Sequence, residues 1–104
     1  MKRHAFKMKL KPGFEKEYQK RHDEIWPELA KAISAAGISD YSIFLDEETL
    51  TLYAMQKLAD KNTAGSLPQH PIVRKWWNYM ADIMDTNPDK SPVAKDLKEV
   101  FHLD

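Results

Sequence analysis

The sequence predicts an α+β protein whose antiparallel sheet carries its helices on one face. Two observations lead to this prediction. Four short segments alternate apolar and polar residues or are rich in β-branched and aromatic residues, as strands are, and two longer segments repeat apolar residues every three or four positions, as helices do. Their order is strand, helix, strand, strand, helix, strand. This is the split βαβ, or ferredoxin-like, arrangement, and the 104 residues are expected to form a single domain, residues 1–104.

The first strand is expected at residues 3–10, where successive side chains should face opposite sides of the sheet. Basic residues dominate one side of this segment. The other side, which we expect to be buried, carries His4, Phe6, Met8 and Leu10.

A helical pattern covers residues 14–36. Pro27 lies inside this run, lacks a backbone donor and clashes with the carbonyl group of Asp23, so we expect the helix to kink or split there. Gly37 is a typical residue for the end of a helix. The apolar positions of the run are Phe14, Tyr18, Ile25, Leu29, Ile33 and Ala36.

Two β-branched and aromatic-rich segments follow, residues 38–46 and 50–57, and the short acidic link between them predicts a hairpin. His70-Pro71 should open the second helix, because proline is tolerated at the first helical position. A last strand is expected at residues 97–103. The apolar stripe of the second helix comprises Ile72, Val73, Trp76, Trp77, Met80, Ile83 and Met84.

The composition excludes several kinds of chemistry. The chain has no cysteine, which rules out disulfides, thiolate nucleophiles and cysteine metal sites. Its 16 basic residues balance 16 acidic ones, so nothing favours nucleic acid or an anionic membrane as a partner. No apolar run approaches the roughly 20 residues of a membrane span, and no signal peptide is visible. We therefore expect a cytoplasmic protein.

One face of the predicted sheet has no helix to cover it. A second copy of the chain, packed sheet against sheet, would bury that face. The expected assembly is a homodimer with a dimeric α+β barrel at its core.

His22 is the first candidate for catalysis. It follows Tyr18 by four residues and precedes Ile25 by three, so the three share one face of the predicted helix. An imidazole with an ordinary pKa of about 6.5 can give and take protons at neutral pH. The alternative is a buried histidine that only fills a hydrogen-bonding place in the core, and spacing alone leaves both interpretations open.

Three aromatic residues are candidates for binding. Trp76 and Trp77 are adjacent on a helix and point about 100° apart, so one can pack in the core while the other lines a cleft. Tryptophan suits the C–H face of a sugar, although packing alone would also explain the pair. Tyr41 can offer its hydroxyl to a ligand or to a backbone group. The four histidines are scattered without metal-ligand spacing.

Two longer motifs resemble the L-rhamnose mutarotase family. The first resembles that family's first-helix signature and covers residues 17–29, EYQKRHDEIWPEL. The second, in the second helix and the loop after it, combines Trp76-Trp77-Asn78-Tyr79-Met80 with Asn87-Pro88-Asp89 and Ser91-Pro92. The resemblance extends over essentially the whole chain, apart from residues 58–70, which look divergent, and Lys75, which stands where an arginine often precedes the tryptophan pair.

The resemblance implies a dimeric α+β enzyme that interconverts α- and β-L-rhamnopyranose without a metal or an organic cofactor. It implies that His22 is the catalytic proton donor. It also implies that Tyr18, Tyr41, Trp76 and Trp77 contact the sugar. The group that would carry the second proton is left open, with Tyr18 and a water among the candidates.

Two other functions are compatible with the same residues. Ferredoxin-like dimers also include cofactor-free and haem-linked monooxygenases, because fold alone does not determine function. A non-catalytic sugar-binding module would use the tryptophans for binding and His22 only as a hydrogen-bond donor. Accelerated anomer exchange, a haem spectrum, or binding without exchange would distinguish the three.

Overall fold

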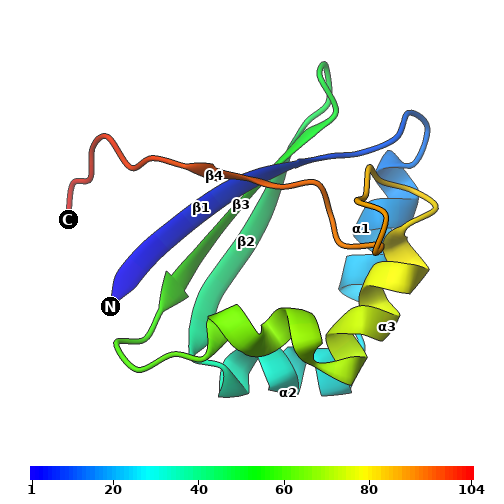
Figure 1. Cartoon of the computed structure of the whole chain (residues 1–104). Coiled ribbons are helices and arrows are strands. Elements are labelled where there is room, and N and C mark those ends of the chain that lie inside the picture. Colours follow the sequence, from blue (N-terminus) through cyan, green and yellow to red (C-terminus); the bar gives the residue numbers. More distant parts are fainter.

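The computed structural model describes residues 1–104 and is an α+β fold built on a four-stranded antiparallel sheet (Figure 1). The strands are β1 (Lys2–Lys9), β2 (Ile38–Asp46), β3 (Thr51–Leu58) and β4 (Lys95–Leu97). Their order across the sheet is β2-β3-β1-β4, and each neighbouring pair is antiparallel. The helices are α1 (Glu15–Asp23), α2 (Pro27–Ala35), the 3₁₀ helix η1 (Ala64–Gln69) and α3 (Pro71–Met80).

The helices gather on one side of the sheet, and the core lies between them and that side (Figure 1). In β1 and β3 the alternation expected for a half-buried sheet is visible in the burial: Met8 and Leu52, which pair in register, are both buried, whereas Tyr53 and Met55 are exposed. The fully buried members of the core include Leu10, Leu52 and Ile83. The other side of the sheet is uncovered.

Pro27 splits the long helical segment in two, as its position predicted. Because proline cannot donate to the carbonyl four residues earlier, α1 ends at Asp23 and the chain turns through Ile25, whose N–H donates to the carbonyl of His22 at 3.2 Å. Pro27 then serves as the first residue of α2, a position that does not need the missing donor.

Two expectations about the second half of the chain were wrong. The last strand is β4, which has three residues, and not residues 97–103; Val100, Phe101 and Leu103 are exposed and pair with nothing. Helix α3 ends at Met80, so Ile83 and Met84 lie beyond it, although both are buried in the core. Their apolar character correctly indicated that they are buried, but a buried residue need not lie in a helix.

No helix of the fold is both long enough and apolar enough to cross a membrane. The cytoplasmic location stays a prediction.

Gly37 ends α2 with a backbone φ of 89°, and a Cβ there would lie 3.0 Å from the Cβ of Asn62 and 3.3 Å from that of Ala59. We predict that Gly37→Ala lowers the free energy of unfolding by about 2 kcal/mol, because the left-handed conformation and the close contact both penalise a side chain. Urea denaturation measures the loss. Gly65→Ala is the matched control, since a Cβ at Gly65 meets nothing within 4 Å, and it should change stability by less than about 0.5 kcal/mol.

Candidate active site

A large open cavity lies between the helices and the covered side of the sheet, with a volume of 1410 Å³. All five residues predicted from the sequence to act on or bind the substrate line it. They are Tyr18, His22, Tyr41, Trp76 and Trp77. These residues come from α1, β2 and α3. They are spread over about sixty residues of the sequence, and the fold brings them to one cavity.

His22 lies in the last turn of α1, partly buried, between two aromatic rings. Its ring stacks on that of Tyr18 with 4.3 Å between centroids and meets the ring of Trp76 edge-on at 5.4 Å. Its Nδ1 lies 3.0 Å from the backbone carbonyl oxygen of Tyr18. Because a carbonyl oxygen can only accept, Nδ1 carries a hydrogen and donates it. In the neutral ring, Nε2 is therefore the atom with a free lone pair, and it has no partner within the chain.

The surroundings of His22 favour this neutral form. Burial lowers the pKa of His22 below its ordinary value of 6.5, and the hydrogen bond to the Tyr18 carbonyl and the charge of Asp23 oppose that shift only in part. At neutral pH the side chain is thus mainly a base with Nε2 available.

Tyr18 and Tyr41 stay protonated at neutral pH. Burial raises the pKa of Tyr18 far above its ordinary value of 10, and the nearby phenol of Tyr41 raises it further. Burial also raises the pKa of Tyr41 to about 12, although 38% of that residue's surface remains exposed. The Tyr18 hydroxyl has no hydrogen-bond partner in the chain, yet it is not sealed from the cavity. Both phenols can therefore donate a hydrogen bond to a ligand, but neither is suited to be a base.

Tyr41 lies in a β-bulge of β2 and lines the cavity together with Ile43 and Leu45. Register along β2 and β3 pairs Ser39 with Lys57 and Ser42 with Met55, so two residues of β2, Asp40 and Tyr41, face one residue of β3. Asp40 adopts a φ of 49°, the strained conformation that such an insertion requires. The sequence showed no signal for this bulge.

The tryptophan pair divides as adjacent helical residues should. Trp76 is a core residue, 8% exposed, with His22 on its cavity side and Trp26 packed edge-on at 5.1 Å between centroids. Trp77 is only partly buried, and the guanidinium of Arg74 lies 5.4 Å from its ring centroid. Trp76 thus links the cavity to the core, while Trp77 forms part of the more open wall.

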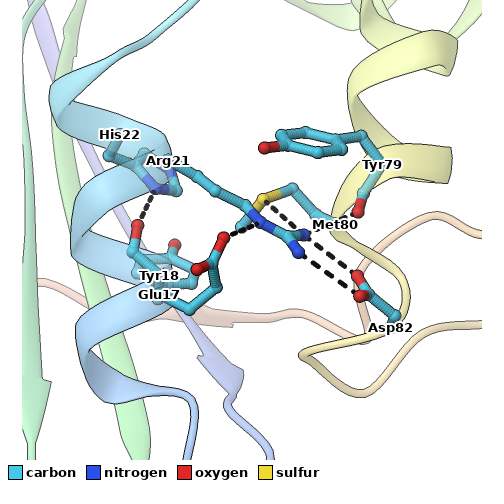
Figure 2. Close-up of polar contacts among 7 residues, drawn as sticks. All are labelled: Glu17, Tyr18, Arg21, His22, Tyr79, Met80 and Asp82. Atoms are coloured by element: carbon cyan, nitrogen blue, oxygen red, sulfur yellow. Dashed lines mark hydrogen bonds and ion pairs between the residues drawn. The ribbon is translucent and has the colours of Figure 1, made fainter.

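Arg21 anchors the helix turn that carries His22 (Figure 2). Its guanidinium group forms ion pairs with Glu17 at 2.8 Å and with Asp82 at 2.9 Å, and it donates to the backbone carbonyl of Tyr79 at 2.7 Å. It also lies 4.2 Å from the centroid of the Tyr79 ring. These contacts tie α1 to the end of α3 and so fix the distance between His22 and Trp76.

Comparison with known proteins identifies the family. A family model described as L-rhamnose mutarotase matches residues 3–103. The chain belongs to the L-rhamnose mutarotase family. An L-rhamnose mutarotase of Flavobacterium johnsoniae is 61% identical over 98% of this chain and 95% of its own length. One of Phocaeicola vulgatus is 59% identical with full coverage of both chains.

A solved structure has the same fold. The crystal structure of an L-rhamnose mutarotase from Formosa agariphila superposes with a TM-score of 0.93 at 51% identity, and the match covers 100% of both chains. At that identity the likeness in fold and the likeness in sequence agree on the L-rhamnose mutarotase family.

Sequence reasoning missed three residues that shape the site: Arg21, Trp26 and Tyr79. Arg21 and Trp26 lie inside the family motif of the first helix, so a signal was present, but their partners on α3 could not be inferred from spacing. The structure also contains no group of three or more histidine, cysteine, aspartate or glutamate residues that could hold a metal ion. The absence of a cofactor stays a prediction.

We predict that His22 titrates with a pKa below 6.5 in the folded protein. Burial penalises the imidazolium, so the charged form appears only at lower pH than in the unfolded chain. NMR of the imidazole C–H resonances against pH measures it, with His22→Ala assigning the signal and the urea-unfolded protein giving the reference. A midpoint at or above the unfolded value would contradict the burial of the His22 ring between Tyr18 and Trp76.

Proposed function

We propose that this chain is an isomerase that interconverts the α and β anomers of L-rhamnopyranose, in support of rhamnose catabolism. The observation that carries the proposal is the position of His22: the residue lines the cavity, its ring contacts those of Tyr18 and Trp76, and its Nε2 has no partner within the chain. Relatives named L-rhamnose mutarotase that align over their whole length support the same substrate.

Anomer exchange requires the hemiacetal to open and to close on the other face of the aldehyde. Opening moves one proton from the anomeric hydroxyl to the ring oxygen while the bond between the anomeric carbon and the ring oxygen breaks. Neutral His22 takes the hydroxyl proton on Nε2 and becomes an imidazolium. It then gives that proton to the ring oxygen, which acts as leaving group. Both oxygens are bonded to the same carbon, so one nitrogen can serve both.

This route agrees with a proton-donor role for His22 and removes the need for a separate second carrier. The donor is the imidazolium formed in the first step, and its lowered pKa makes the proton easy to release. Tyr18 and Tyr41, whose pKa values are raised, bind sugar oxygens as protonated phenols. Trp76 and Trp77 contact the C–H face and the methyl group of the sugar.

The same proposal includes a homodimer, with residues 1–104 as one ferredoxin-like domain in each copy. The strand order β2-β3-β1-β4 supports that fold class. The uncovered sheet side offers Phe44, Tyr53 and Met55 as exposed apolar contacts for the barrel-like interface. Nucleic acid and membranes are not proposed as partners.

We predict that His22→Ala lowers catalysed exchange of the L-rhamnose anomers by about 10²–10⁴-fold, the usual contribution of a general acid–base group. Saturation-transfer NMR of the anomeric protons measures the exchange rate. His102→Ala is the matched control, because His102 lies in the exposed tail and pairs only with Asp104. This variant should catalyse anomer exchange at the wild-type rate.

Exchange by His22→Ala at the wild-type rate would remove this residue from the mechanism. Sugar binding by the wild type without accelerated exchange would identify a binding module, and a Soret band after incubation with haem would favour the oxygenase class.

We predict that the protein in solution has the mass of two chains, and that Met55→Lys reduces it to one by placing a charge in the apolar interface. Light scattering coupled to size exclusion measures the mass. Val93→Lys, at an exposed apolar residue off the sheet, is the control and should stay dimeric. A wild-type mass of one chain at micromolar concentration would rule out the proposed dimer.

A further inference from the structure

We propose that Gln56 is a further substrate-binding residue, whose side-chain carbonyl oxygen accepts a hydrogen bond from a ring hydroxyl of the sugar. His4 and Asp96 are positioning residues that hold the Gln56 amide in the required orientation. The proposal rests on the function proposed above and adds a specificity determinant to it.

Gln56 is unusual among the buried residues of the chain. It is the one buried residue that is polar, and it is 8% exposed. Its Nε2 is paired with Nδ1 of His4 at 2.9 Å, whereas its Oε1 has no partner in the chain. That oxygen is nevertheless not sealed in the core, and Gln56 lines the cavity. A nearly buried, unpaired amide oxygen on a residue that lines the cavity can be satisfied by a donor bound there.

The hydrogen bonds run in one direction through His4. The amide N–H of Gln56 donates to Nδ1 of His4, so the hydrogen of the neutral imidazole is on Nε2. Nε2 in turn donates to Oδ1 of Asp96 at 3.1 Å. Since the carboxylate can only accept, it fixes the tautomer of His4. The tautomer then fixes which end of the Gln56 amide faces the histidine, and leaves the oxygen for the cavity.

Asp96, His4 and Gln56 form a row of hydrogen-bonded side chains, and strand pairing places this row next to Tyr41. His4 and Gln56 are direct partners across β1 and β3, and the bulge in β2 sets Tyr41 opposite Gln56 on the other side. Neighbouring strands lie about 4.8 Å apart, so a sugar that touches the Tyr41 hydroxyl is within reach of Gln56. The ring of Phe6 neighbours those of both His4 and Tyr41, with 5.3 Å between its centroid and that of His4 and 6.5 Å to that of Tyr41.

The cavity therefore has two chemically different walls. The helices present aromatic rings that suit a C–H face, and the sheet presents two polar groups, the amide oxygen of Gln56 and the hydroxyl of Tyr41. An acceptor that is almost buried discriminates strongly, because a sugar lacking the matching hydroxyl leaves the amide oxygen desolvated and unpaired. Gln56 should thus help the site to select among sugars according to the hydroxyls that their rings carry.

The test compares kcat and KM for L-rhamnose exchange between the wild type and Gln56→Met, which keeps the length of the side chain and removes its polar atoms. The expected result is a KM raised about tenfold with kcat nearly unchanged, since the lost contact forms equally in ground and transition states. Gln69→Met is the matched control on an exposed glutamine outside the cavity, and both constants should stay as in the wild type.

Substrate analogues identify the partner hydroxyl. L-rhamnose derivatives that each lack the hydroxyl at C2, C3 or C4 are assayed with both enzymes. For one derivative, the wild type should show the raised KM, and Gln56→Met should cause no further increase. Additive effects for all three derivatives would overturn the proposal, as would an unchanged KM for Gln56→Met with L-rhamnose.

If circular dichroism shows that Gln56→Met does not fold, Asp96→Ala provides the test instead. Asp96 is 84% exposed at its side chain, so its removal leaves the fold intact. It frees His4 to turn, and KM should rise about threefold, a fraction of one hydrogen bond; an unchanged KM overturns the inference. If the wild type accelerates exchange of no sugar, the proposed function fails instead, which is a separate result from any effect at Gln56.

Discussion

The hydrogen bond from His22 Nδ1 to the backbone carbonyl of Tyr18 determines the chemistry available to this site. It joins a side chain to the carbonyl one helical turn earlier, so the helix itself orients the ring. It also decides the tautomer, and with it which nitrogen has a free lone pair. Burial then keeps that nitrogen unprotonated at neutral pH. A helix of nine residues thus supplies an oriented base without any carboxylate to hold it.

The break at Pro27 makes that arrangement possible. Had the helix continued straight, residues after His22 would have extended α1 past α3; instead the chain turns, and Trp26 packs against both Trp76 and Tyr79. Arg21 holds the same junction from the other side through Asp82 and Tyr79. Arg21 of α1 and Trp26, which immediately precedes α2, both contact Tyr79, so ionic and aromatic contacts hold the chain on either side of His22 against α3.

The sequence predicted what depends on local pattern and missed what depends on pairing. Period and proline position predicted the first three strands, both helical regions and the split at Pro27, and the five proposed site residues line one cavity. The bulge at Asp40, the ion pair of Arg21 with Asp82 and the row from Asp96 to Gln56 each join residues that are distant in the chain or depend on register. The short β4 shows the same limit, because residues 98–103 have strand-like composition but do not continue the pairing of β4 with β1.

The division of the cavity into an aromatic wall and a polar sheet fits the demands of anomer exchange. The open-chain aldehyde must rotate about one bond before it closes again, so the site cannot hold the anomeric carbon rigidly. Stacking on Trp76 and Trp77 is tolerant of small rotations, because dispersion contacts lack a sharp directional requirement. Hydrogen bonds to the ring hydroxyls are directional. Their proper place is the part of the sugar that does not move, and the polar groups of Gln56 and Tyr41 lie on the sheet, opposite the helices that carry His22 and Trp76.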